Sequence, residues 1–193
     1  MKTIELSGAD MERRTSRFAR LKPLAIQNDP EIPLAAKDLV YCRKLLSVVG
    51  LESAAATPIN EGAPIKGAAG MTMTLGVCPA GTGPGLHAHH KTYETFTILQ
   101  GRFEFRWNDE GGERVTLDRF DTISFPPRVN RAFTNVGDED GIIQVIITGG
   151  VHDMSDIDGA PIMAQRLKEF GDVVYRKFEA AGLSFNAHKN ATD

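Results

Sequence analysis

The sequence has little of several features that would assign it to a specialised class of proteins. Its 193 residues include only two cysteines, Cys42 and Cys78, which lie far apart and form no CxxC pair. This predicts two reduced core thiols and excludes a disulfide framework. No hydrophobic run approaches the length that spans a bilayer. The first 18 residues contain acidic side chains and lack the apolar core of a signal peptide, so we expect a cytoplasmic protein with no membrane partner.

A strong charge of one sign is also lacking. The 22 Lys and Arg residues and 25 Asp and Glu residues give a net charge of −3, which provides no general reason to expect nucleic acid as a partner. The one basic cluster, within residues 13–22, is diluted by nearby acidic residues and is typical of a solvated segment. The sequence contains no G-x-S-x-G motif, phosphate-binding loop, dinucleotide fingerprint or CxxC zinc pattern. It therefore lacks the signatures of serine hydrolases, P-loop nucleotide-binding proteins, dinucleotide-binding enzymes and CxxC zinc proteins.

The stretch of residues 81–101, GTGPGLHAHHKTYETFTILQG, holds the most informative polar side chains. His87 and His89 are two positions apart, so on a strand both imidazoles point to the same face. Glu94 follows at an odd spacing, and a turn around residues 91–92 would return it to that face before a new strand at 95–99. Two imidazoles and a carboxylate form a ligand set suited to a divalent Fe, Mn, Ni or Zn ion with open coordination positions.

These residues carry a family resemblance. Gly81, His87, His89, Glu94 and Gly101 match the first cupin motif, G(X)5HXH(X)4E(X)6G, at every position. The sequence therefore resembles the cupin superfamily as a single-domain protein, because no internal repeat is present. The resemblance implies an all-β jelly-roll barrel (a double-stranded β-helix) with a ligand pocket and a divalent metal ion held by three histidines and one glutamate.

The second cupin motif, G(X)5PXG(X)2H(X)3N, is only partly present at residues 120–135. Pro126 and Asn135 match, but Phe120 and Arg128 replace its two glycines, and Arg131 replaces the fourth metal ligand. A guanidinium about 5 Å from a divalent ion, at an effective dielectric constant near 20, would cost roughly 7 kcal/mol.

Three arrangements would relieve this repulsion. The Arg131 side chain swings away, an anion lies between it and the metal, or Arg131 pairs with Glu94 and replaces the metal. The second arrangement makes Arg131 a substrate anchor, because guanidinium groups bind planar anions in bidentate fashion. The leading function that the resemblance implies is then a metal-dependent oxygenase for a small acidic or aromatic compound. The alternatives are a metal-free cupin that binds, isomerises or eliminates a carboxylated ligand, and a non-catalytic ligand-binding module.

The chain divides into an N-terminal extension (1–42), a β-barrel (43–150) and a C-terminal helix with a tail (151–193). Short strands are expected in the barrel because alternating segments are separated by turn residues, and a loop is expected at 54–70. Met73 alternates with polar residues in one such strand, and we expect it to line the pocket with Phe96 and Phe133. The expected strands are 43–52, 71–77, 95–99, 102–107, 115–117, 121–125, 131–136 and 142–148.

Two apolar features lie near the end of the chain. The run IIQVII at 142–147 predicts a strand buried on both faces, which suggests a dimer contact. An apolar stripe then predicts one helix that opens at Pro161 and ends at Gly182. Its members are Met163, Leu167, Phe170, Val174 and Phe178. Because cupins are commonly dimers, the resemblance adds a homodimer to the expected small-molecule ligand.

Overall fold

The structure is a computed structural model that describes residues 1–51, 57–68, 70–149 and 154–191. Its strands form two sheets, in the orders β2-β1-β3-β10-β5-β8 and β11-β4-β9-β6-β7, and every pairing except the parallel β1–β2 pair is antiparallel. The strands are β1 (Lys44–Leu51), β2 (Ile65–Ala68), β3 (Met71–Cys78), β4 (His87–His89), β5 (Tyr93–Gln100), β6 (Phe103–Trp107), β7 (Glu113–Leu117), β8 (Thr122–Phe125), β9 (Arg131–Asn135), β10 (Gly141–Thr148) and β11 (Ile157–Gly159). The expected all-β jelly-roll architecture is confirmed.

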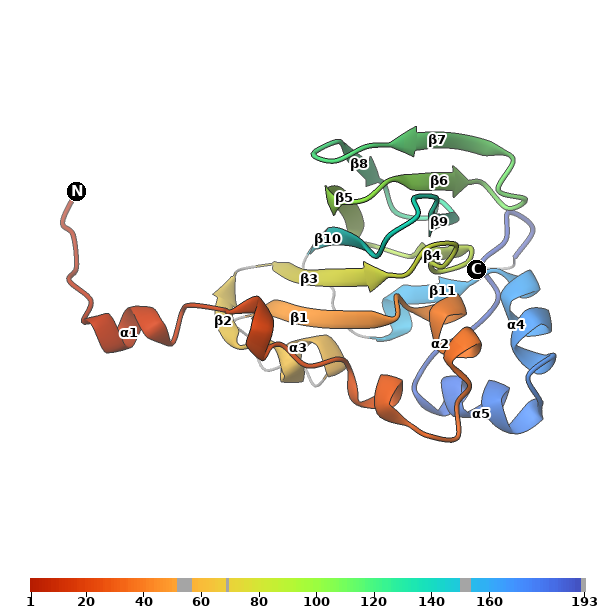
Figure 1. Ribbon diagram of the computed structural model, residues 1–193, viewed down its shortest axis with the longest axis horizontal. Coiled ribbons are helices and arrows are strands. Elements are labelled where there is room, and N and C mark those ends of the chain that lie inside the picture. Colours follow the sequence, from red (N-terminus) through yellow and green to blue (C-terminus); the bar gives the residue numbers. More distant parts are fainter. Residues whose placement is uncertain (52–56, 69, 150–153, 192–193) are drawn as a thin grey trace.

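The helices lie outside the barrel. The α-helices are α1 (Gly8–Glu12), α2 (Leu34–Val40), α3 (Pro58–Gly62), α4 (Pro161–Lys168) and α5 (Asp172–Ala180), and the 3-10 helices are η1 (Phe18–Arg20), η2 (Ala25–Asn28) and η3 (Met154–Asp156). Helices α2, α4 and α5 gather at one end of the barrel (Figure 1). No helix in the described parts of the chain is long and apolar enough to cross a membrane.

Phenylalanine side chains fill the space between the two sheets. Phe96 lies with its ring centroid 5.2 Å from those of both Phe105 and Phe133, and Phe125 lies 6.1 Å from Phe96. Phe103 completes the group, and its side chain is fully buried. Such tilted and edge-on ring pairs stabilise a core beyond their buried area. These phenylalanines, from β5, β6, β8 and β9, therefore form the core of the barrel.

A second apolar cluster joins the two ends of the chain. Ile32 and Leu39 from the N-terminal extension pack with Met163, Leu167 and Phe178 from α4 and α5. The two flanking segments thus bury their apolar stripes against each other, at the end of the barrel where Figure 1 shows the three helices. Strand β11, which follows residue 150, also pairs with β4 and extends the five-stranded sheet beyond the expected barrel segment.

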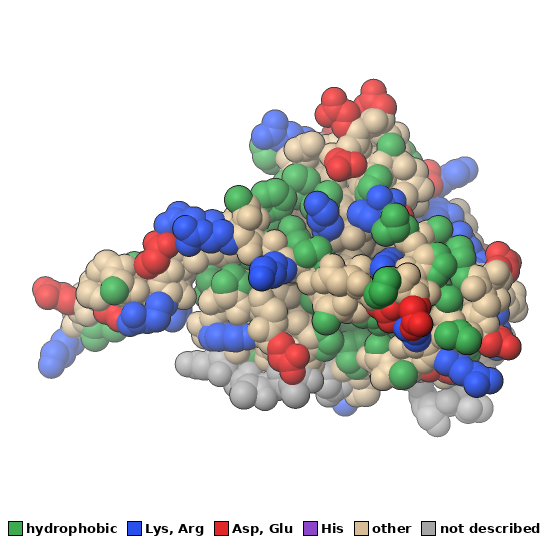
Figure 2. Space-filling model, turned by 60° about the horizontal axis from the view of Figure 1, so that its bottom comes forward, with side chains coloured by type: hydrophobic (Ala, Val, Ile, Leu, Met, Phe, Trp, Pro, Cys, Tyr) green, Lys and Arg blue, Asp and Glu red, His purple; other side chains and the backbone are tan. Residues whose placement is uncertain are grey.

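The start of the chain extends away from the barrel (Figure 1). Along it, Arg13 pairs with Asp10, and Arg17 pairs with Glu12 at 2.8 Å. Figure 2 shows basic and acidic side chains side by side on this arm. The basic cluster of the sequence is therefore partly neutralised by local pairs.

Several expectations about secondary structure were wrong. The expected single C-terminal helix is two helices, because Gly171 adopts φ = 108° between α4 and α5, and this leaves Phe170 exposed. The expected loop at 54–70 contains α3 and β2, while residues 52–56 and 69 lie outside the described residues. In β10, burial alternates along the strand, so the IIQVII run is not buried on both faces within the chain.

The two replaced glycines of the second motif keep the backbone conformation that glycine favours. Phe120 has φ = 76° and Arg128 has φ = 68°. This left-handed region is strained for bulky side chains, at about 1–3 kcal/mol each. The ring of Phe120 lies under the Arg119 guanidinium, at 4.4 Å from ring centroid to carbon. The departures from the motif thus change the side chains and keep the turn geometry.

Candidate metal centre

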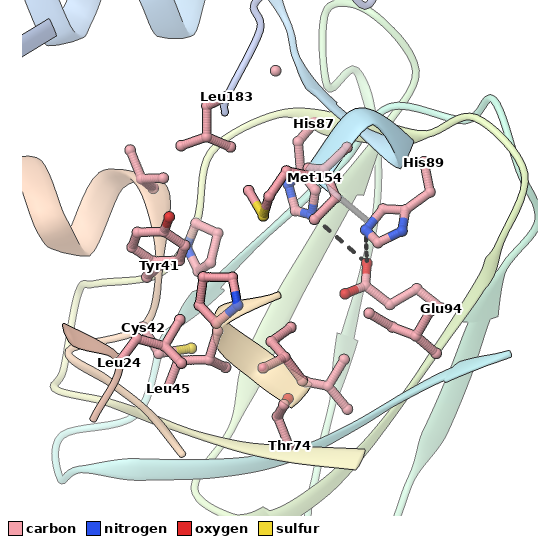
Figure 3. Close-up of a pocket in the computed structure, with 18 of the residues that line it drawn as sticks. Leu24, Tyr41, Cys42, Leu45, Thr74, His87, His89, Glu94, Met154 and Leu183 are labelled. Atoms are coloured by element: carbon pink, nitrogen blue, oxygen red, sulfur yellow. Dashed lines mark ion pairs between the residues drawn. The ribbon is translucent and has the colours of Figure 1, made fainter. Parts of the chain in front are cut away.

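Two strands from opposite sheets bring the three predicted metal ligands together. Strand β4 in the five-stranded sheet carries His87 and His89, and β5 in the six-stranded sheet carries Glu94. The bend at residues 90–92 joins the two strands, at the place where the sequence predicted a turn. One ligand atom from each residue lies within 4.8 Å of the others. Figure 3 shows both imidazoles directed towards the Glu94 carboxylate.

Hydrogen bonds fix the orientation of both imidazole rings. Nδ1 of His87 lies 2.9 Å from the Gly85 carbonyl oxygen, which can only accept a hydrogen bond. Nδ1 of His89 lies 2.8 Å from the Thr92 hydroxyl and 3.2 Å from Asp156 Oδ2. The Thr92 hydroxyl itself donates to Asp156 Oδ2, so the His89 Nδ1–H is the remaining donor. Both rings therefore donate a hydrogen bond through Nδ1 and turn Nε2 towards the site, which is the orientation of metal-binding histidines.

Glu94 is the anionic member of the group. Its Oε2 lies 3.6 Å from His87 Nε2 and 3.7 Å from His89 Nε2. Burial by itself would raise the pKa of this carboxyl, but the Arg131 charge and the two histidines outweigh burial and hold the pKa well below its usual value. Burial lowers the pKa of His89, which favours the neutral ring. At neutral pH the site thus contains one carboxylate and a neutral His89.

Arg131 lies behind Glu94 and outside the cavity. It opens β9 opposite His87, and its side chain is fully buried. Nε and Nη2 donate to Glu94 Oε2 at 2.9 and 2.6 Å, and Nη1 donates to the Val129 carbonyl oxygen at 3.2 Å. Of the three arrangements considered for Arg131, the structure has the pair with Glu94. In this arrangement the guanidinium is occupied by a protein carboxylate, and the role of Arg131 as a substrate anchor stays a prediction.

The donor set fits a divalent first-row metal ion. Metal–ligand bonds of about 2.1 Å place neighbouring ligand atoms roughly 3–3.5 Å apart, close to the 3.6 and 3.7 Å between each Nε2 and the carboxylate oxygen. The group His87, His89 and Glu94 could therefore hold a metal ion. Such an ion would share the carboxylate with Arg131. Nitrogen and oxygen donors of this kind do not select among Fe, Mn, Ni and Zn.

A cavity of about 320 Å³ opens beside the three ligands. Phe96 and Phe133 line it, as the sequence predicted, but Met73 does not. Thr72 and Thr74 take that place on β3, and Met73 lies on the opposite, half-buried face. An alternating sequence shows which side chains share a face of the strand, but it does not show which of the two faces points into the barrel. The register decides it here, because Thr74 pairs with Val145, which faces the cavity.

Sequence reasoning missed Asp156 and most of the cavity wall. Asp156 is 67 positions from His89, and no spacing rule connects them. It accepts hydrogen bonds from His89, from Thr92 and, at 2.8 Å, from the Lys91 backbone N–H. The two segments that flank the barrel, which are the N-terminal extension and the C-terminal segment with α4 and α5, also contribute wall residues, including Tyr41 and Leu183 (Figure 3). These segments are called the flanks below. The apolar periodicity of these flanks was visible in the sequence, but their packing partner was not.

Asp156→Asn is expected to weaken metal binding by about 10–100-fold, because the neutral amide no longer holds the His89 Nδ1–H as a carboxylate does. Competition with a chromophoric chelator measures this affinity. Asp158→Asn is the matched control, since Asp158 is also buried but accepts a hydrogen bond from the Asn186 backbone N–H. Equal losses of metal affinity in the two variants, at equal thermal stability, would show that Asp156 does not act through His89.

The comparison with family models identifies the class of protein. Residues 74–147 match the cupin domain. Together with the jelly-roll sheets and the complete first motif, this shows that residues 74–147 form a cupin domain. No curated protein matches the chain.

Solved structures with a similar fold include lyases and a predicted decarboxylase. A structure of the DMSP lyases RdDddP and RnDddQII is 19% identical, with 60% of this chain and 51% of that chain covered and a TM-score of 0.46. DMSP lyase DddQ from Ruegeria pomeroyi is 22% identical, with 56% and 48% covered and a TM-score of 0.45. A predicted oxalate decarboxylase from Thermotoga maritima is 24% identical, with 40% and 65% covered and a TM-score of 0.38. The chain thus spans about half the length of the lyase chains, and these similarities say nothing about its reaction.

Proposed function

We propose that this protein is a metal-dependent oxygenase that acts on a small molecule in the cavity beside His87, His89 and Glu94. The observation that carries the proposal is the fixed orientation of both imidazoles. Each Nδ1–H is bound to a protein acceptor, and both Nε2 atoms point to one carboxylate. A ligand group prepared in this way is typical of metal sites. Three protein ligands leave open coordination positions.

The chain's own residues prepare the site for this chemistry. When bound, the metal supplies a place for O2 and a Lewis acid that stabilises developing negative charge. His87 and His89 remain in place because Gly85 and Asp156 hold their outer nitrogens. The largely apolar cavity wall lowers the local dielectric constant, which strengthens electrostatic interactions inside. Of the two expected kinds of substrate, the acidic one loses its anchor because Arg131 already binds Glu94.

Oxygen consumption by Fe(II)-loaded protein tests the proposal. A panel of phenolic and carboxylic compounds is offered to the wild type, and O2 uptake is followed with an electrode. We expect at least one phenolic compound to give uptake that a His87→Ala/His89→Ala variant, loaded in the same way, does not give. Uptake that is equal in both proteins, or absent in both across the panel, would contradict the oxygenase proposal.

The ion pair between Arg131 and Glu94 favours a second candidate. It satisfies the buried carboxylate without any metal, at the position where the family has a fourth ligand. The protein would then be a metal-free cupin that binds, isomerises or eliminates a ligand, with His87 or Glu94 as acid or base. This candidate predicts that chelators leave ligand binding and turnover unchanged. Binding without any turnover would instead identify a ligand-binding module.

A further inference from the structure

We infer that the cavity is a binding site for an uncharged, largely apolar molecule, and that the segments flanking the cupin domain select it. The inference rests on the proposed function only in placing the ligand's one polar group at the end of the cavity where His87, His89 and Glu94 lie. The selection of an uncharged molecule follows from the cavity wall alone.

The charges around the cavity disfavour anions. Among the described residues that line it, none is a lysine or an arginine, whereas Glu94 and Asp156 are both present. Arg131 is a buried cation beside Glu94, and its donors are taken by Glu94 and by backbone carbonyl groups. A carboxylate placed in such a cavity would lose its hydration without gaining a cation, which is unfavourable.

Most of the wall is apolar. The barrel contributes Phe96, Phe133, Val145 and Ile147. The two flanks complete the enclosure with residues that lie outside the matched domain at 74–147. These flanking residues are Leu24, Ile26, Tyr41, Met154, Met163, Leu183 and Phe185. Because the domain supplies the polar ligands and the flanks supply much of the apolar wall, ligand choice depends on segments that the family match does not include.

Size and local medium agree with this description. The cavity of about 320 Å³ has room for a compact ring compound. Burial raises the pKa of Tyr41 to about 12, so the medium at this wall already disfavours a negative charge on a protein group. Thr72 and Thr74 provide hydroxyl groups on the opposite barrel wall.

A pair of probes with equal numbers of non-hydrogen atoms tests the inference. 2-Acetylnaphthalene is uncharged, and 2-naphthoate is its anionic counterpart. Both are titrated calorimetrically into the full chain at neutral pH, as purified and after treatment with EDTA. We expect the ketone to bind at least about tenfold more tightly than the anion in the EDTA-treated protein, because only the anion must be desolvated without a partner.

Variants in the flanks locate the selectivity. Leu24→Lys and Leu183→Lys each place a cation at the wall, from different ends of the chain, and either is expected to reverse the preference towards naphthoate. Phe170→Lys is the matched control, since Phe170 is 38% exposed and does not line the cavity. Circular dichroism confirms that each variant is folded, and one folded flank variant is sufficient for the test.

The outcomes separate this inference from the proposed oxygenase activity. Tighter binding of naphthoate, a preference smaller than tenfold, or no binding of either probe overturns the inference, whether or not O2 is consumed. Unchanged selectivity in both flank variants overturns the role of the flanks. Selective binding of the ketone supports the inference even in a protein that shows no O2 uptake, where only the oxygenase proposal fails.

Discussion

Arg131→Met is expected to lower the free energy of unfolding by about 3–5 kcal/mol, because it leaves the buried Glu94 carboxylate without its cation. Both residues are almost fully buried, and the two guanidinium nitrogens lie 2.9 and 2.6 Å from the same carboxylate oxygen. Methionine keeps much of the side-chain volume, so the loss reports the charge and not a cavity. Denaturant unfolding of the metal-free protein measures it.

Two further variants make the result specific. Arg17→Met removes one member of an exposed pair with Glu12, and we expect a change below about 1 kcal/mol. The double variant Glu94→Gln/Arg131→Met removes both buried charges and is expected to be more stable than Arg131→Met alone. If Arg131→Met is as stable as the wild type, then Glu94 has another partner in the variant. The ion pair between Arg131 and Glu94 would then not be what stabilises the buried carboxylate.

Loss of bound metal in His87→Ala/His89→Ala is the second large expected effect. The wild type is expected to purify with a nearly stoichiometric divalent first-row metal ion, because two preoriented imidazoles and a carboxylate converge on one point. Removing both imidazoles leaves one carboxylate that is already paired with Arg131. Elemental analysis of freshly purified proteins should therefore find metal in the wild type and almost none in the variant.

His90→Ala is the matched control for the metal content. His90 adjoins His89, but half of its side chain is exposed, and its Nε2 lies 3.9 Å from Asp158. This variant should keep the metal of the wild type. A wild type without metal, even after reconstitution, would mean that Arg131 has replaced the metal, and the metal-free function would then be the better description.

The sequence predicted the ligand group because local geometry is enough to define it. The alternate spacing of His87 and His89 places two imidazoles on one face, and the turn before Glu94 is short. The structure brings these three residues together at the expected point. Most of the barrel strands were also predictable, because they have an alternating pattern bounded by turn residues, whereas β2 lies in a segment that was expected to be a loop.

Side-chain direction and pairing were harder to predict. Met73 was assigned to the cavity although Thr72 and Thr74 face it, because the choice of interior face depends on a register set by β10. The apolar stripe near the C-terminus continued through Phe170, but Gly171 breaks the helix with a left-handed φ. The spacing of apolar residues by itself does not predict that the helix is interrupted at this glycine.

What the sequence by itself determined is the barrel class and the identity of the three candidate metal ligands, since both follow from spacings within a few residues. Only the tertiary structure decided that Arg131 pairs with Glu94, that Asp156 orients His89, and that both flanks enclose the cavity. Each of these contacts joins residues tens of positions apart. Their partners are chosen by how sheets and helices pack, and no local pattern encodes that choice.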